Sequence, residues 1–150
     1  MLALPAAGCT AAVPLVTVDT LLAQCDAFKG KPVQLAGYLG QCSGYECYLA
    51  ADKARWAALV SALDNTHGHQ SHAKQAEAWS RANALWPIGV GGGEAFDRKA
   101  GPFQQSYVVI SGTVAKDSCD GQGGTDRSSG ISPTDIRAWK KSEGAPDNSK

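Results

Sequence analysis

The chain has 150 residues, and its 14 basic and 14 acidic side chains give a formal net charge of zero at neutral pH. Apolar residues make up 43% of the chain, but 24 of them are Ala, whereas Leu, Ile, Val and Phe together number only 27. Because a disordered chain of low hydrophobicity usually also has a high net charge, this composition predicts one small folded domain with a thin core and long polar loops. No apolar run approaches the ~20 residues that a membrane-spanning helix needs.

The first nine residues are small and apolar, and they end in an Ala-Ala-Gly-Cys sequence at Cys9. This ending resembles the cleavage end of a bacterial lipoprotein signal peptide, in which a small residue precedes the Cys that is acylated. The resemblance implies lipidation of Cys9 and a periplasmic or cell-envelope location, with the membrane reached only through the lipid anchor. We therefore interpret residues 1–18 as a signal-peptide remnant and tether. The alternative is a frayed N-terminus with a free thiol.

The next segment predicts a short helix and a β-hairpin. Thr17 to Thr20 offers capping residues, apolar side chains recur at helical spacing to Phe28, and Gly30 marks the end of the helix. Residues 33–39 then alternate apolar and polar side chains, and residues 46–51 form a second strand-like run. The short polar connection between these runs predicts that they pair as a hairpin.

A helical insertion is predicted after the hairpin. Apolar residues between Trp56 and Leu63 recur at helical spacing, and Asp52 is well placed to cap them. A second helical pattern carries Trp79 and Trp86 on one face until Pro87 interrupts it. We expect the insertion to span residues 54–85.

The remaining chain predicts three strands separated by loops. The run from Gly89 to Glu94 lacks the Lys-Ser/Thr of a phosphate-binding loop and precedes no convincing helix, so a turn is predicted there. The segment richest in β-branched residues predicts the clearest strand. The expected elements are strands over residues 87–90, 107–114 and 135–139, a polar loop over 117–130, and a disordered, solvated tail over 142–150.

Apart from Cys9, the chain has four cysteines, which permit three pairings. The Gly-containing connection between Cys42 and Cys47 favours a disulfide within the hairpin, which leaves Cys25 to pair with Cys119. The second disulfide would close a loop of about 95 residues and contribute on the order of 4 kcal/mol in the chain-entropy model. The alternative is zinc, but structural zinc sites usually need Cys pairs separated by two to four residues.

Two strands share the pattern V-x-[L/I]-small-G-x-[L/V], with Gly37 and Gly112 at matched positions. A Gly inside a strand often marks a sharp bend, so the repeated pattern predicts a closed sheet.

The order of these elements, with Gly30-Lys31-Pro32-Val33 leading to Gly37, resembles the tRNA-anti-like branch of the OB-folds found in small bacterial proteins. The resemblance implies a mainly β fold with helical additions (α+β). We expect a five-stranded OB-like β-barrel over residues 19–141, with an N-terminal helix and the helical insertion between strands 2 and 3.

OB-folds bind oligonucleotides and oligosaccharides through strands 2 and 3 and two loops, which here would be residues 40–46 and 116–130. Three tyrosines in this region, Tyr38, Tyr45 and Tyr48, are the candidate ligand-binding residues, although they could instead pack against the inserted helices. A nucleic-acid surface also needs Lys and Arg. The two loops carry Glu46, Asp117, Asp120 and Asp126 against Lys116 and Arg127, and this balance argues against nucleic acid.

The histidines His67, His69 and His72 have spacings that can bind Zn²⁺ or Cu²⁺, but they lie in a polar loop without a neighbouring acid, so no metal is expected. No nucleophile has a base held nearby, so neither an enzyme nor a cofactor is predicted. The expected function is non-enzymatic binding of a peptide, glycan or protein partner in the cell envelope. The alternative is a nucleic-acid-binding OB domain.

Overall fold

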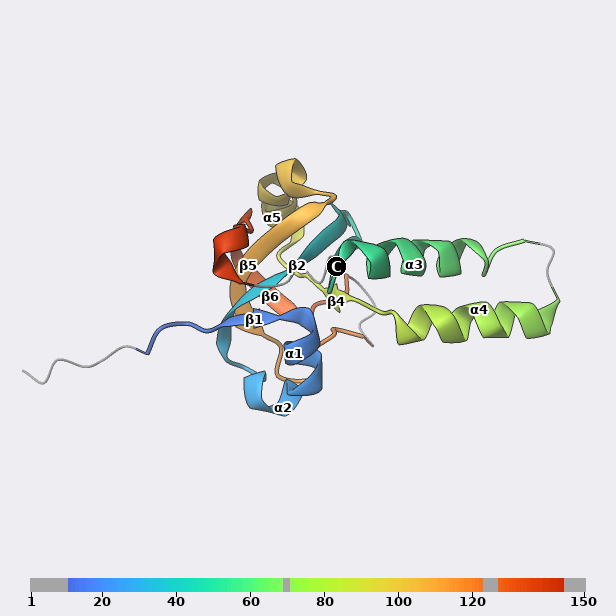
Figure 1. Ribbon diagram of the computed structural model, residues 1–150, viewed down its shortest axis with the longest axis horizontal. Helices are drawn as coiled ribbons and strands as arrows, with labels where there is room; N and C mark the ends of the chain where they lie inside the picture. Colours follow the sequence, from blue (N-terminus) through green and yellow to red (C-terminus); the bar gives the residue numbers. More distant parts are fainter. Residues whose placement is uncertain (1–10, 69–70, 123–126, 145–150) are drawn as a thin grey trace, which may run out of the picture.

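A computed structural model describes residues 11–68, 71–122 and 127–144 (Figure 1). Within them the fold is mixed α+β, with five α-helices and a six-stranded, mostly antiparallel sheet. The elements in chain order are β1 (Leu15–Thr17), α1 (Val18–Ala23), α2 (Cys25–Phe28), β2 (Pro32–Ser43), β3 (Glu46–Ala50), α3 (Lys53–Asp64), α4 (His72–Ala84), β4 (Ile88–Gly89), α5 (Gly93–Ala100), the 3₁₀ turn η1 (Gly101–Phe103), β5 (Ser106–Val114), β6 (Ile131–Ala138) and the 3₁₀ turn η2 (Lys141–Glu143).

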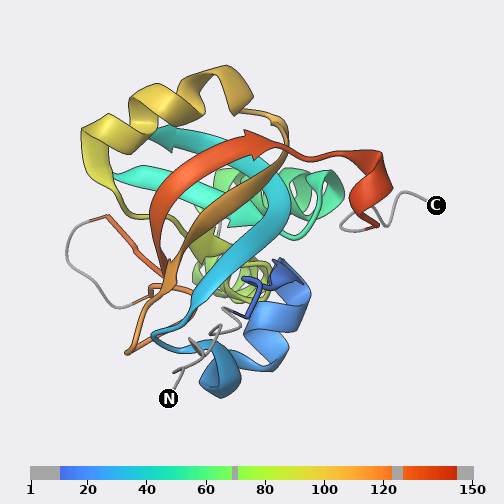
Figure 2. The same cartoon turned by 90° about the vertical axis from the view of Figure 1, so that its left-hand side faces the viewer.

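The long strand β2 organises the sheet, whose strands are ordered β4-β3-β2-β5-β6 with β1 parallel to the start of β2. Figure 2 shows β2, β5 and β6 as long, curved strands. The pairing of β5 with β6 shifts register between Ser111 and Gly112, so this glycine lies at a bulge as its position in the strand predicts. Gly37 instead provides space, because a Cβ there would lie 2.6 Å from the Ala50 carbonyl oxygen.

The sheet is not closed into a barrel, so the expected five-stranded barrel is wrong in both strand number and closure. The two edges of the sheet, at β4 and β6, approach each other at one point. There Val90 forms an isolated parallel bridge with Ile131, and the Gly91 N–H donates to the Ile131 carbonyl at 3.0 Å. The physical reason is the length of β4. It has only two residues before the glycine-rich turn into α5, which is too short for a continuous ladder with β6.

The core lies between the curved sheet and helices α1 and α5. Both expected disulfides are present, joining Cys25 to Cys119 and Cys42 to Cys47. The largest fully buried side chains are Leu21, Leu35, Leu39, Leu49, Ile88, Ile110 and Ile131, with Val33, Val90, Val108, Val109 and Val114. The disulfides cross-link a core that is rich in valine and poor in aromatic side chains, as the composition predicts.

Several predicted boundaries are wrong because tertiary contacts replace local signals. Helix α5 forms where a turn was expected, since Phe96 and Ala100, one helical turn apart, are buried against the core. Strand β1 forms within the expected tether by pairing with β2. The N-terminal helix breaks at Gln24, and β6 begins at Ile131, earlier than expected. The expected tail begins with η2, which is held by an ion pair between Arg137 and Glu143.

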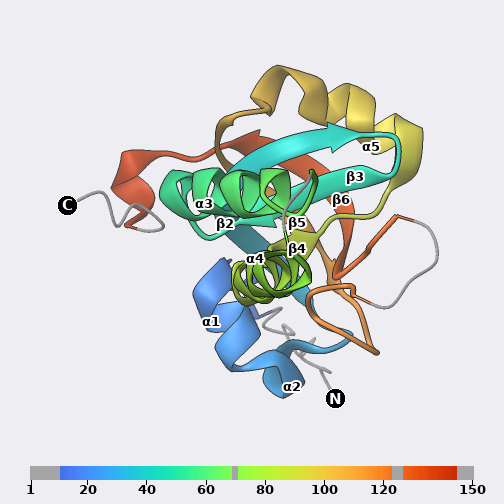
Figure 3. The ribbon, with the colours of Figure 1, turned by 90° about the vertical axis from the view of Figure 1, so that its right-hand side faces the viewer.

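The predicted insertion forms a helical hairpin of α3 and α4 that projects from the sheet (Figure 1) and is seen end-on in Figure 3. Leu59, Ala62 and Ala82 form a small separate core in it. Trp79 is 46% exposed, whereas Ala78 and Ala82 face inward, because small side chains let the two helices approach closely. No helix in the described ranges is long and apolar enough to span a bilayer.

Candidate functional site

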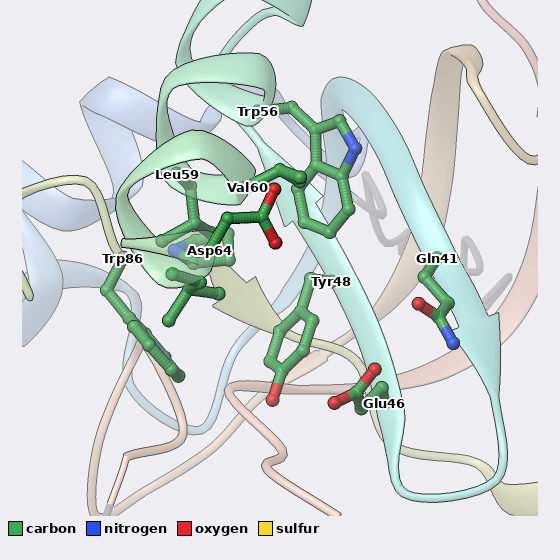
Figure 4. A pocket seen from close by; sticks show the side chains of 10 residues that line it. Gln41, Glu46, Tyr48, Trp56, Leu59, Val60, Asp64 and Trp86 are labelled. Atoms are coloured by element: carbon green, nitrogen blue, oxygen red, sulfur yellow. The ribbon is translucent and has the colours of Figure 1, made fainter. Parts of the chain in front are cut away.

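A pocket of about 200 Å³ lies where the helical hairpin meets the β2–β3 hairpin (Figure 4). Three of its walls are aromatic side chains, which come from β3, from the first turn of α3 and from the segment after α4. Carboxylates and an amide stand beside them. We call it the aromatic pocket, and its lining residues are Gln41, Glu46, Tyr48, Trp56, Leu59, Val60, Leu63, Asp64, Trp86 and Pro87.

The alternation of side chains along β3 and the N-terminal cap of α3 fix the positions of two walls of the aromatic pocket. Cys47 and Leu49 are buried in the core, so Glu46 and Tyr48, which alternate with them along β3, face the helices. Helix α3 begins almost at once after β3, because the Asp52 carboxylate accepts a hydrogen bond from the Arg55 N–H at 2.7 Å. These two walls of the aromatic pocket therefore belong to a strand and to the first turn of a helix.

Trp56 lies directly against β2, and this contact depends on a glycine. A Cβ at Gly40 would lie 2.5 Å from the indole ring of Trp56. The indole can therefore approach the strand only because position 40 has no side chain. On the other side of the pocket, Trp86 packs edge-to-face on Tyr48, with ring centroids 5.9 Å apart and an interplanar angle of 74°.

The charges of the aromatic pocket have one sign. Glu46 and Asp64 contribute carboxylates, and no Lys, Arg or His is among the described residues that line it. Burial raises the pKa of the Tyr48 hydroxyl, and the nearby Glu46 carboxylate raises it further, whereas a hydrogen bond with Ser128 lowers it. The phenol is therefore neutral near neutral pH, and the net charge of the lining is negative.

The three tyrosines predicted as ligand-binding residues do not form one surface. Tyr48 lines the aromatic pocket, and Tyr45 is 79% exposed at the hairpin turn. Tyr38 is only 4% exposed, because its ring packs edge-to-face on Tyr107 with centroids 5.2 Å apart and its hydroxyl donates to Gln105 at 3.2 Å. Tyr38 is thus a packing residue, and the candidate site shifts from three tyrosines to one tyrosine and two tryptophans.

Sequence reasoning placed Trp56 and Trp86 on predicted helices but did not assign them to a site. Both stand at ends of the insertion that adjoin the sheet, Trp56 one turn after the Asp52 cap and Trp86 directly before Pro87. An aromatic residue at the junction of an insertion and a strand pair is the signal that could have indicated them.

The two basic residues of the expected loops do not form a phosphate-binding surface. Arg127 is held inside the fold, where its guanidinium pairs with Asp97 of α5 at 2.5 Å and donates to the Val90 and Gly91 carbonyl oxygens. Its side chain is only 10% exposed. Lys116 remains exposed, with its side chain beside Gly30. Of the acids in the second loop, Asp117 is exposed and Asp120 accepts hydrogen bonds from Ser118 and Gln122.

Among the residues that the structure describes, the histidines do not come together as a metal site. His67 and His72 are exposed on either side of the α3–α4 connection, while His69, like Cys9 and Asp126, lies outside the described residues. Within the described part of the chain, Cys42, Cys47 and Asp97 come close enough to hold an ion, but both sulfurs form a disulfide. A metal site therefore has no support from these side chains.

Comparison with known proteins found no matching family model and no significantly similar curated protein or solved structure. The functional assignment is therefore drawn from the chemistry of the aromatic pocket.

Proposed function

We propose that this protein is a non-enzymatic binding module of the bacterial cell envelope and that it binds its ligand in the aromatic pocket. The extracytoplasmic location is supported by the two disulfides, because disulfides persist in oxidising compartments. The lipoprotein-like ending at Cys9 agrees with that location. Acylation of Cys9 would tether the domain to the membrane.

The order of the strands supports the OB-like interpretation. Strands β2, β3 and β4 are successive neighbours, and β5 returns to lie beside β2, which is the Greek-key order. OB-folds are partly open Greek-key barrels, so the open sheet is compatible with this family. Their ligands bind on strands 2 and 3, which correspond here to β3 and β4. The aromatic pocket adjoins the face formed by β3 and β4, and the helical hairpin of α3 and α4 covers it.

The observation that carries the proposal is the convergence of Tyr48, Trp56 and Trp86 on one hollow beside two carboxylates. Ligand sites are concave and mostly apolar, with a few polar groups that orient the ligand. Nucleic acid is the weaker candidate. Binding it requires cations that neutralise phosphates, whereas the pocket lining is acidic and Arg127 is paired with Asp97.

The binding role is tested by NMR of the full-length, oxidised protein, with the four Trp indole N–H signals as reporters. Three classes of probe are titrated to about 10 mM, a range that detects weak binding: N-acetyl amino-acid amides of each charge, a neutral disaccharide and a short oligonucleotide. We expect saturable shifts of the Trp56 and Trp86 signals with an amino-acid amide or the disaccharide, and no shift of Trp139, which packs on Tyr107. A response to the oligonucleotide alone would favour the nucleic-acid alternative.

A pair of variants ties such shifts to the pocket. Trp56→Ala should abolish binding, whereas Tyr45→Ala, which removes the exposed tyrosine at the hairpin turn, should leave it unchanged. Failure of every probe to shift the pocket signals would refute the proposed function. The location is tested by the mass of the protein from its native cells: an acylated chain beginning at Cys9 supports the envelope, and an unmodified Met1 with five reactive thiols contradicts it.

A further inference from the structure

We infer that the occupant of the aromatic pocket is a positively charged side chain, Lys or Arg, presented by a peptide or protein partner. This inference rests on the proposed binding role of the pocket and names the chemistry of its ligand.

Three sources of negative potential meet at the pocket. Glu46 belongs to the β2–β3 hairpin and Asp64 is the last residue of α3, so the two carboxylates approach from different elements (Figure 4). The C-terminus of a helix is itself a centre of partial negative charge. The last turn of α3 contains no basic residue, and neither carboxylate forms an ion pair within the described ranges of the chain.

The position of Asp64 points to an external cation. An acidic side chain at a helix C-terminus is repelled by the helix dipole, so it destabilises the isolated helix. A bound cation would convert this repulsion into attraction to both the carboxylate and the helix end. Glu46 lines the same hollow from the β2–β3 hairpin, so a cation bound there would be attracted by both carboxylates.

The aromatic walls suit the same occupant. Cations bind favourably over the faces of Trp and Tyr rings, with Trp the strongest of the natural side chains. The aliphatic part of a Lys or Arg side chain would contact Leu59 and Leu63, while its charged end reaches the carboxylates. An anion or phosphate would meet only negative charge in the described lining.

The size and rim of the pocket indicate a side chain of a polypeptide. A volume of about 200 Å³ is below the ~300–1,000 Å³ of sites for drug-sized ligands, and it accommodates one long side chain. The rim is apolar and open to solvent at Val60, which lines the pocket and is 39% exposed. The chain on either side of the bound residue would cover this rim.

The test compares matched probes on the full-length, oxidised protein by NMR titration. The probes are Nα-acetyl-lysine amide, its neutral counterpart Nα-acetyl-norleucine amide, the peptide Ala-Ala-Lys-Ala-Ala with blocked ends, and n-butylammonium, which carries the charge of a Lys side chain without a peptide backbone. We expect the lysine amide to bind at least about tenfold more tightly than the norleucine amide, because cation–π and carboxylate interactions are added. The preference should shrink as salt is raised. The pentapeptide should bind more tightly than n-butylammonium.

Isosteric variants test the role of charge. The double variant Glu46→Gln/Asp64→Asn should lose the preference for lysine but keep weak binding of the norleucine amide. The control Glu77→Gln/Glu94→Gln removes the same charge from exposed sites on α4 and α5 and should keep the preference. Each pocket substitution is also made singly, so that a partial loss can be measured if the double variant does not fold.

Each outcome separates the inference from the proposed function. If the norleucine amide or the disaccharide binds as tightly as the lysine amide, the aromatic pocket is a binding site but the inference is overturned. If n-butylammonium binds as tightly as the pentapeptide, a free amine replaces the polypeptide as the occupant. If no probe binds, both proposals fail.

Discussion

Removal of the Cys25–Cys119 disulfide should destabilise the protein much more than removal of the Cys42–Cys47 disulfide. The two differ in the length of chain that they close, with sequence separations of 94 and 5 residues. In the chain-entropy model these separations correspond to about 4.7 and about 2 kcal/mol at 25 °C. Because single domains are stable by about 5–15 kcal/mol, the long-range disulfide supplies a substantial fraction of the total.

Local packing cannot produce this order of effects. Cys42 and Cys47 are 2% and 1% exposed, Cys119 is 3% exposed and Cys25 is only partly buried. Replacement by Ala therefore leaves a cavity at least as large at the short-range pair as at the long-range pair. If packing dominated, the short-range variant would be the less stable of the two.

The assay is urea unfolding followed by tryptophan fluorescence, with Cys25→Ala/Cys119→Ala compared with Cys42→Ala/Cys47→Ala. Cys9 is replaced by Ser in every protein, so that no free thiol exchanges with the remaining disulfide. We expect the free energy of unfolding to be lower by about 2–3 kcal/mol in the long-range variant than in the short-range one. Equal losses, or the opposite order, would refute the reasoning.

Three further predictions concern single positions. Asp97→Asn leaves the 10%-exposed guanidinium of Arg127 without its counter-charge, and it should cost about 3 kcal/mol in urea unfolding. Gly37→Ala places a Cβ 2.6 Å from a backbone oxygen, and the strand displacement should cost about 2 kcal/mol. A hydrogen bond from Arg137 lowers the pKa of Glu143 from 4.5 to about 2. The stabilising contribution of this ion pair is therefore present above pH 4.5 and is lost as the pH falls toward 2. An NMR titration of the Glu143 carboxyl group measures this pKa.

Each of these predictions has a control or a result that would contradict it. Gly101→Ala adds the same methyl group where no atom lies within 4 Å, so it should leave stability nearly unchanged. Unchanged stability of Asp97→Asn would mean that the carbonyl oxygens around Arg127 suffice to hold it. A Glu143 pKa near 4.5, or an acid-unfolding profile that Glu143→Gln does not alter, would contradict the ion pair with Arg137.

Elements with strong local signals were predictable from the sequence. The alternation after Val33 specifies a strand, Asp52 caps the helix that follows the hairpin, and the spacing of Cys42 and Cys47 favours their pairing. In each case the determining interaction joins residues close in sequence, so it operates before the rest of the chain has folded. Once the short-range disulfide is assigned, Cys25 and Cys119 are left to pair with each other.

Elements stabilised by distant contacts were not predictable in this way. Helix α5 follows glycines and depends on docking Phe96 into the core, and β1 exists only because β2 lies beside it. Closure of the sheet failed at β4, whose length is limited by the turn into α5. Propensity is a weak prior, and burial against distant residues overrides it.

The candidate site also combines features set by the local sequence with features set by distant contacts. The sequence by itself determined that tyrosines and Glu46 lie in and beside the hairpin loop, and it singled out Tyr48 as a candidate. Only the tertiary structure decided that Tyr38 is buried against Tyr107 and that Trp56 and Trp86 complete the pocket. The physical reason is that a pocket depends on which surfaces of separate elements meet, and here the packing of the helical hairpin against β2 and β3 brings them together.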